Sequence, residues 1–210
     1  MKKEKIILIL NGELSNYKDI TSFLEEYNII VCADGAANKI IKLGIEPDYI
    51  LGDLDSIDSD NLKKYSKNII QLKNQEYNDL HKSLLWIKEK NIKKIDIIGI
   101  DGKRIDHTIG NFSIILKELF NFDLTVFTES GIFYTIKTKR KFKDIYNRYF
   151  SIFSPKKDTK ITTWGLKYEL KNKTLDNIHK GTLNFANENE VEIETNNEVL
   201  VFISNEIKEN

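Results

Sequence analysis

The run Leu51-Gly52-Asp53-Leu54-Asp55-Ser56-Ile57 is the stretch from which the fold of the whole chain can be worked out. It continues a short apolar segment, Tyr49–Leu51, that is typical of a buried strand. If the chain stays extended, Asp53 and Asp55 project to the same side, because side chains at i and i+2 share a face. Two carboxylates at the carboxyl end of a strand suit a small, hard cation such as Mg²⁺. The alternative is an ordinary turn, since Gly, Asp and Ser are common turn residues.

Apolar segments alternate with amphipathic segments on both sides of this run. The strands expected in the first part of the chain are Lys5–Leu10, Asn28–Ala33, Tyr49–Leu51, Asn68–Leu72, Lys94–Ile100 and Leu124–Thr128. The helices expected between them are Tyr17–Tyr27, Ala36–Leu43, Asp60–Ser66, Asn78–Lys90 and Ile105–Phe120. Strands that are apolar throughout and separated by helices predict a parallel sheet covered on both faces. We therefore expect residues 1–130 to form a Rossmann-like α/β domain.

The pattern changes after about Ser130. Short, often alternating apolar segments follow one another between polar turns, and the strands expected are Ile132–Ile136, Tyr149–Phe153, Lys160–Trp164, Lys167–Leu170, Val191–Glu194 and Val199–Ile203. The one segment there whose sequence also fits a helix is Phe142–Arg148. This spacing predicts an antiparallel β-sandwich, which we expect to be a second domain formed by residues 131–210.

Composition narrows the classes of function. The 32 basic residues balance the 32 acidic ones, so neither a nucleic-acid partner nor a membrane surface is expected. The apolar run Ile6–Leu10 is too short for a signal peptide, and no segment has transmembrane length, so we expect a cytoplasmic protein. The single cysteine, Cys32, excludes an internal disulfide framework and lies in an apolar segment, where a small buried hydrophobe is favoured over a nucleophile.

Polar clusters follow several of the predicted strands. In an open parallel sheet, ligands bind beyond the carboxyl ends of the strands, and the clusters that fall there are Ala33–Asn38, Gly52–Ser56, Gln75–Asp79 and Gly99–His107. The side chains that we single out in and beside these clusters are four carboxylates and two cations: Asp34, Asp53, Asp55, Asp79, Lys82 and Arg104. Carboxylates that hold Mg²⁺, with cations and helix N-termini that neutralise phosphate oxygens, are the parts that phosphoryl transfer requires.

Each of these residues also has a purely structural interpretation. Asp34 and Asp79 could be helix caps, and Lys82 could be a solvated charge. Arg104 with Asp106 could form a structural salt bridge. His107 could act as a general base or pair with Asp106. A Walker-type glycine–lysine loop is absent from the sequence, which excludes an ordinary P-loop kinase.

Taken together, the motifs resemble those of the thiamine pyrophosphokinases. The family pattern has Ala-Asp-Gly-x-Ala-Asn, then Gly-Asp-Phe-Asp-Ser, then a Thr-Asp helix start and a loop ending in Gly-Arg-x-Asp-His. The corresponding segments here are Ala33–Asn38, Gly52–Ser56, Gln75–Asp79 with Lys82, and Gly99–His107. In the second half, Thr162–Tyr168 is similar to the family's Thr-x-Gly-Leu-Lys-Trp/Tyr segment, and Gly181–Glu188 occupies the place of its Ser-Asn segment.

The resemblance implies a thiamine diphosphokinase. Such an enzyme transfers pyrophosphate from ATP to the thiamine hydroxyl with Mg²⁺, giving AMP and thiamine diphosphate. The resemblance also implies a homodimer in which the α/β domain of one subunit and the sandwich of the other enclose thiamine. The roles implied are Mg²⁺ binding for Asp34, Asp53, Asp55 and Asp79; catalysis for Asp53, Asp55, Asp79, Lys82 and Arg104; contacts to ATP for Asp34, Gln75, Asn78, Arg104, Asp106 and His107; and thiamine binding for Asn38, Tyr168 and Asn187.

Three positions depart from the family pattern. Ala186 stands where a serine is usual beside Asn187, Asn78 replaces the threonine before Asp79, and Ala36 replaces a frequent glycine. Ala186 removes a hydroxyl that could contact the substrate, so the identity of the acceptor is less constrained than the reaction. Two alternatives therefore stay open: a pyrophosphokinase for another heteroaromatic alcohol, and a non-catalytic sensor of nucleotide or thiamine diphosphate.

Overall fold

The structure is a computed structural model that describes residues 5–14 and 19–208. It divides into two compact units, of which the first ends at Ile114 and the second begins at Ile115. The division falls within helix α5 (Ile105–Glu118). In the part of the chain that the structure describes, every helix is too short or too polar to cross a membrane.

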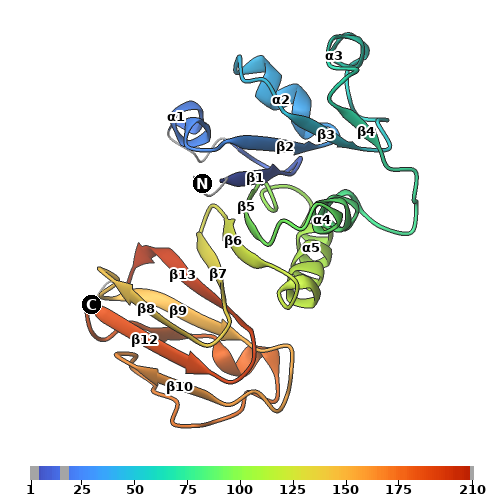
Figure 1. Cartoon of the computed structure of the whole chain (residues 1–210). Coiled ribbons are helices and arrows are strands. Elements are labelled where there is room, and N and C mark those ends of the chain that lie inside the picture. Colours follow the sequence, from blue (N-terminus) through green and yellow to red (C-terminus); the bar gives the residue numbers. More distant parts are fainter. Residues whose placement is uncertain (1–4, 15–18, 209–210) are drawn as a thin grey trace. The chain divides into compact units, whose positions relative to one another are not determined.

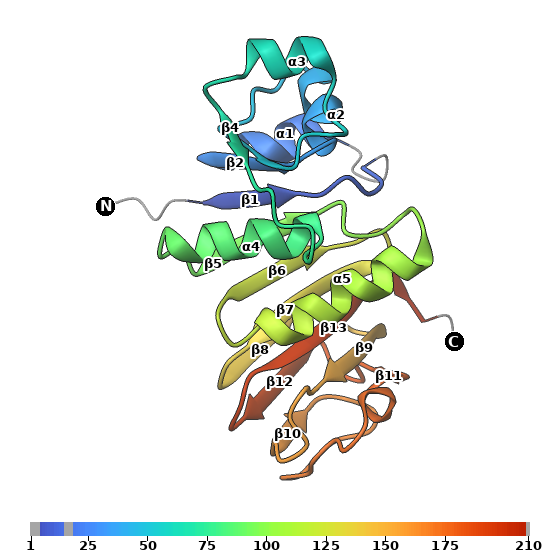
Figure 2. The ribbon, with the colours of Figure 1, turned by 90° about the vertical axis from the view of Figure 1, so that its right-hand side faces the viewer.

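The first unit is a parallel sheet with helices on both faces. Its strand order is β5-β1-β2-β3-β4, with bounds β1 Ile6–Ile9, β2 Ile29–Ala33, β3 Tyr49–Gly52, β4 Ile69–Gln71 and β5 Lys94–Ile98. The helices are α1 Ile20–Glu25, α2 Ala36–Lys42, α3 Ser59–Lys64 and α4 Asp79–Glu89, together with the start of α5. Helices α1 and α2 lie on one side of β1 and β2 and α4 on the other (Figures 1 and 2). The α/β prediction is confirmed.

Burial on both faces explains why these strands are apolar along their length. All four residues of β1 are buried, and β1 pairs in parallel with β2 on one edge and β5 on the other. Helix α4 begins where expected, because the Asn78 side chain accepts a hydrogen bond from the His81 amide at 3.0 Å. Helix α1 is shorter than predicted and is capped by Asp19; the predicted residues 17 and 18 lie outside the described residues.

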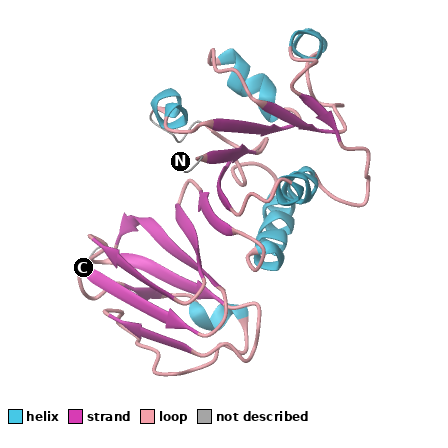
Figure 3. Ribbon diagram, viewed as in Figure 1, coloured by secondary structure: helices cyan, strands magenta, loops and turns pink. Residues whose placement is uncertain are grey.

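The second unit consists of two antiparallel sheets. The strands are β6 Asp123–Phe127, β7 Gly131–Ile136, β8 Lys139–Lys143, β9 Arg148–Phe153, β10 Ile161–Trp164, β11 Asn184–Phe185, β12 Glu190–Thr195 and β13 Val199–Ile207, with one 3-10 turn, η1 Ile178–Gly181. One sheet has the order β11-β9-β13-β7-β6 and the other β10-β12-β8. Figure 3 shows how strands dominate this unit. The predicted sandwich is confirmed.

The two sheets share one apolar core. Phe142 of β8 packs edge-on against Phe150 of β9 with ring centroids 5.9 Å apart, and Ile193, Val201 and Ala186 are fully buried in the same cluster. Aromatic and branched side chains that interdigitate between sheets are the usual source of sandwich stability.

Two local predictions in this half are wrong. Phe142–Arg148 is not a helix, because Phe142 of β8 pairs with Val191 of β12, and Asp144 and Asn147 have positive φ angles of 57° and 58°. Such angles turn the chain instead of continuing a right-handed helix. Lys167–Leu170 is not a strand: it follows a turn at Gly165, where φ is +82°.

Candidate active site

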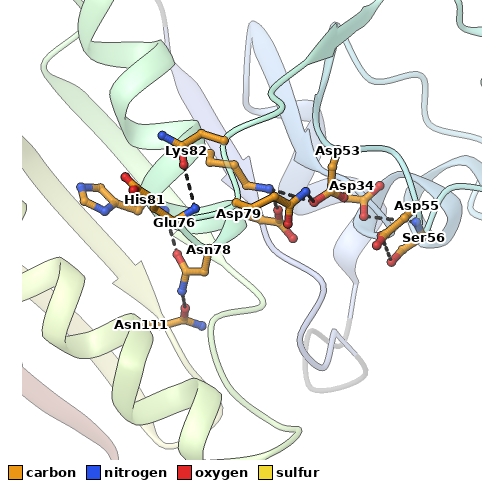
Figure 4. A network of polar contacts seen from close by, with 12 residues as sticks. Asp34, Asp53, Asp55, Ser56, Glu76, Asn78, Asp79, His81, Lys82 and Asn111 are labelled. Carbon is orange, nitrogen blue, oxygen red and sulfur yellow. Dashed lines mark hydrogen bonds and ion pairs between the residues drawn. The ribbon is translucent and has the colours of Figure 1, made fainter.

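Three carboxylates gather at the carboxyl ends of β2 and β3. Asp34 follows β2, while Asp53 and Asp55 follow β3, and one oxygen of each lies within 4.8 Å of the other two. The parallel pairing of Ala33 with Leu51 places these strand ends side by side. Figure 4 shows the three side chains close together. We call Asp34, Asp53 and Asp55 the acidic cluster.

Asp34 is the buried member of the cluster. The residue is 3% exposed, and one oxygen accepts a hydrogen bond from the Ser56 amide at 3.3 Å. The other oxygen, Oδ1, has no hydrogen-bond partner among the residues that the structure describes. Burial, reinforced by the neighbouring Asp55 carboxyl, raises the pKa of Asp34 from 3.8 to about 6. A buried carboxylate oxygen with no partner is costly, and a bound cation would satisfy it.

Local backbone geometry makes the cluster. A Cβ atom at Gly52 would lie 2.8 Å from the Cβ of Asp34, so only glycine allows the two strand ends to approach this closely. Leu54 has a φ angle of +73°, so the chain turns between Asp53 and Asp55. The extended geometry predicted for this segment is therefore wrong. The turn interpretation and the clustering of carboxylates both hold, because the turn itself brings Asp55 back towards Asp53.

Lys82 joins the acidic cluster to helix α4. Its side chain is 5% exposed, and its Nζ lies 3.2 Å from Asp53 Oδ2 and 2.8 Å from Asp79 Oδ1. Burial alone would lower the pKa of Lys82, but the two carboxylates outweigh it and raise the pKa above its ordinary value. Burial alone would likewise raise the pKa of Asp53, yet the hydrogen bond and charge of Lys82 lower it. Gln75 contacts the same Asp53 oxygen at 3.5 Å.

The loop between β5 and α5 forms another wall. Gly12 donates its amide to Gly99 O at 2.8 Å, and a Cβ at Gly12 would lie 2.1 Å from that oxygen, so the turn after β1 fits tightly against this loop. Arg104 holds Asp106 through two hydrogen bonds of 3.1 and 2.6 Å. Hydrogen bonding to Arg104 lowers the pKa of Asp106 to about 2. Asp106 thus pairs with Arg104, and His107 is exposed.

A cavity of about 450 Å³ lies between these walls. The predicted site residues that line it are Asp53, Gln75, Asn78, Asp79, Lys82, Arg104 and His107. Asp34 and Asp55 adjoin it through the acidic cluster, and Asp106 adjoins it through Arg104. Asp79 is held by Lys82 and is not one of the three carboxylates of the cluster.

Asn38, a predicted thiamine contact, has a structural role in this unit. Its Nδ2 donates to Ser56 O at 2.9 Å, and its Oδ1 accepts from the Asp58 amide at 3.1 Å and from Asn61 Nδ2 at 3.0 Å. These bonds fasten the segment after β3, which carries Asp53 and Asp55, to helix α2.

The other two predicted thiamine contacts lie in the second unit. Tyr168 is 63% exposed and Asn187 is exposed, so both side chains are available to a ligand. Their neighbour Ala186 is fully buried in the apolar core of the sandwich. A hydroxyl at position 186 would therefore face the core.

Sequence reasoning misses part of the cavity wall. The lining residues outside the predicted polar clusters include Asn11, Gly12, Thr108 and Asn111. Tyr77, Asp101 and Lys103 also line the cavity and lie within those clusters, but no role is predicted for them individually. The pattern at Asn11 and Gly12 indicates only a turn, although these residues follow a strand at the same sheet edge. Thr108 and Asn111 are three residues apart on α5, and their helical spacing from Arg104 is a usable signal.

Comparisons with known proteins cover both halves of the chain. The family model described as "Thiamin pyrophosphokinase, catalytic domain" matches residues 20–128, and the model described as "Thiamin pyrophosphokinase, substrate-binding domain" matches residues 131–202.

Individual proteins similar to this chain carry the same family name. Thiamin pyrophosphokinase 1 of Caenorhabditis elegans is 30% identical over 195 residues, covering 81% of this chain and 76% of that protein. Thiamine pyrophosphokinase of Bacillus subtilis is 27% identical, covering 80% and 82%. The crystal structure of a Bacillus subtilis thiamine pyrophosphokinase has a TM-score of 0.76 at 24% identity, covering 95% and 98%, and that of Candida albicans thiamin pyrophosphokinase has 0.77 at 22%, covering 98% and 90%. At these identities the two structures show the shared fold.

Proposed function

The chain belongs to the thiamin pyrophosphokinase family, and from this premise we propose that it transfers pyrophosphate from ATP to the hydroxyl of thiamine, giving AMP and thiamine diphosphate. One observation carries the proposal: an acidic cluster, with its ligand atoms within 4.8 Å of one another, adjoins a cavity that also contains Lys82 and Arg104. We assign residues 1–130 to catalysis and 131–210 to thiamine binding, and the bounds of the two family models support this division.

The acidic cluster fits Mg²⁺. It offers only carboxylate oxygens, the donors that this ion prefers, and Asp34 Oδ1 is buried with no hydrogen-bond partner within residues 5–14 and 19–208. Asp34, Asp53 and Asp55 would hold the ion, and the exposed Asp55 leaves room for water or phosphate oxygens. When bound, Mg²⁺ supplies positive charge that neutralises phosphate oxygens during transfer.

Lys82 and Arg104 supply the remaining positive charge. Lys82 is fixed by two ion pairs and buried, so its ammonium needs little reorganisation when a polyphosphate enters the cavity. Arg104 is more exposed and is oriented by Asp106. Gln75, Asn78 and His107 line the same cavity and complete the expected contacts to ATP.

The acceptor is a primary alcohol whose proton must leave. Asp79 is the candidate acceptor for that proton, since its carboxylate lines the cavity and is 43% exposed. Thiamine also carries a permanently cationic thiazolium ring, and the exposed aromatic face of Tyr168 could attract it by about 1–2 kcal/mol once desolvated. Following the family resemblance, we assign Tyr168 and Asn187 of the partner subunit to the thiamine site of a homodimer.

Product analysis tests the reaction. Purified protein is incubated with ATP, Mg²⁺ and thiamine, and the products are resolved by chromatography. We expect equimolar AMP and thiamine diphosphate, and loss of both in Asp53→Ala. AMP without thiamine diphosphate would show hydrolysis or a different acceptor. Tight nucleotide binding without turnover would instead identify a sensor and contradict the proposal.

Subunit complementation tests the shared site. Asp53→Ala and Tyr168→Ala homodimers are each expected to be impaired, because each lacks one half of every site. Mixed dimers contain one site with both halves intact, so unfolding and refolding the two variants together should restore activity. Failure to restore activity, or a fully active monomer in light scattering, would contradict the homodimeric site.

A further inference from the structure

We propose that Asn78 and Asn111 form a positioning pair that sets the spacing of two walls of the cavity and thereby the placement of Lys82 against the nucleotide. Asn78 Nδ2 donates to Asn111 Oδ1 at 2.9 Å (Figure 4). Asn78 precedes the first residue of α4, and Asn111 lies on α5, so this one bond joins the two helices. This inference rests on the proposed function, because it concerns how that site holds ATP.

The pair belongs to a chain of hydrogen bonds with a fixed direction. At one end, the backbone amide of His81 donates to Asn78 Oδ1 at 3.0 Å. At the other end, Asn111 Nδ2 donates to the backbone carbonyl of Ile100 at 3.1 Å. A backbone amide can only donate and a carbonyl can only accept, so both side-chain amides have one orientation in which every bond is made. Reversing either amide would oppose donor to donor or acceptor to acceptor.

The two ends of this series of hydrogen bonds lie on the two sides of the cavity. Asn78 fixes the first turn of α4. Its backbone carbonyl accepts a hydrogen bond from the Lys82 amide at 2.9 Å, and Asp79 and Lys82 form their ion pair in the same turn. Ile100 lies in the loop between β5 and α5, which also carries Arg104. Both asparagines line the cavity themselves. The pair therefore links the Lys82 wall to the Arg104 wall, and polyphosphate would have to fit between them.

The two functions of Asn78 can be separated by substitution. Serine is as good a helix cap as asparagine, but its hydroxyl is too short to reach Asn111, so Asn78→Ser keeps the cap and removes the link. Asn111→Asp is nearly isosteric and still accepts from Asn78, but it cannot donate to Ile100 O. Asn121→Ala is the matched control: it removes an asparagine that donates to Glu118 Oε2 at 2.8 Å and does not line the cavity.

Steady-state kinetics and thermal unfolding of the full-length protein test the pair. Because the bond between Asn78 and Asn111 is exposed, we expect a rise of only about threefold to tenfold in KM for ATP in Asn78→Ser, Asn111→Ala and Asn111→Asp. KM for thiamine should stay within about twofold, and Tm should match that of Asn121→Ala. The Asn78→Ser/Asn111→Ala double variant should be no worse than Asn111→Ala alone, because Asn111→Ala already removes the bond to Asn78 together with the bond to Ile100.

A loss of stability with unchanged KM for ATP would overturn the proposal, as would additive effects in the double variant. If the wild type makes no thiamine diphosphate, the proposed function fails first. The pair is then tested by calorimetric titration with ATP, in which the same loss of affinity and the same non-additivity are expected. Unchanged affinity for ATP in all three single variants would refute the proposal.

Discussion

The burial of Asp34 leads to a prediction in which a site variant gains stability. Without a cation, the folded protein must keep a carboxyl group that is 3% exposed and has one oxygen with no hydrogen-bond partner in the described part of the chain. A pKa raised from 3.8 to about 6 corresponds to a cost of up to about 3 kcal/mol for the ionised form, because one pKa unit is worth about 1.4 kcal/mol. The Asp34→Asn substitution replaces this carboxyl with a neutral amide and removes that cost. The amide oxygen can still accept the Ser56 hydrogen bond, and asparagine tolerates the φ angle of +42°.

The pH dependence has a definite sign. The folded state keeps the Asp34 proton up to about pH 6, while the unfolded chain releases it near pH 3.8. The wild type therefore loses stability as pH rises through this window, and the cost is fully present above about pH 6. In EDTA at about pH 7.5, Asp34→Asn should be more stable than the wild type by about 1–3 kcal/mol, and the gain should fall towards zero near about pH 4.

Urea unfolding followed by circular dichroism measures this difference. Asp60→Asn, at an exposed position of α3, controls for the loss of one negative charge. Saturating Mg²⁺ should reverse the order of stability, because a bound ion stabilises only the folded state and Asp34→Asn lacks a ligand for it. A variant less stable than the wild type in EDTA at about pH 7.5, or a gain independent of pH, would refute the reasoning.

Three further predictions concern single side chains. Lys82→Met should lower kcat by about 10²–10³-fold in product assays, because it removes a preorganised charge beside the cavity. Lys82→Arg should recover little activity, since a planar guanidinium cannot replace a buried ammonium that lies 3.2 Å from Asp53 and 2.8 Å from Asp79. Gly52→Ala should destabilise the protein by about 1–3 kcal/mol in urea unfolding and weaken Mg²⁺ binding in titration calorimetry, because its Cβ would lie 2.8 Å from the Asp34 Cβ; unchanged Mg²⁺ affinity would contradict this. Ala186→Ser should leave KM for thiamine unchanged and cost about 1–3 kcal/mol of stability, because the hydroxyl would enter a fully buried apolar site; a lower KM would show that position 186 does reach the substrate.

The elements of the first unit could be predicted because both faces of its sheet are covered. A strand such as Ile6–Ile9 must then be apolar throughout, and helices must separate successive parallel strands. The second half is harder to predict. Asp144 and Asn147 adopt positive φ angles in a polar stretch that also fits a helix, and only the pairing of β8 with β12 decides between them.

The site is predictable at strand ends and less so elsewhere. Topology alone brings Asp34 beside Asp53, since β2 and β3 are neighbours in a parallel sheet. The structural bonds of Asn38 depend on where the segment after β3 folds back onto α2, which a short loop sequence does not encode by periodicity. Asn111 is not among the predicted site residues, because its helical spacing from Arg104 indicates only the face of α5 on which it lies and not that its partner is Asn78.

The acidic cluster also bears on how the chain reaches its native state. Asp34 and Asp53 are far apart along the chain and meet only because Ala33 pairs with Leu51. A shift of one residue between these strands would turn the side chains of one of them to the opposite face. Such a misaligned chain could not assemble the cation site, so added Mg²⁺ would favour the correctly aligned form over it. A metal that serves the chemistry would in this way also select the native strand register during folding.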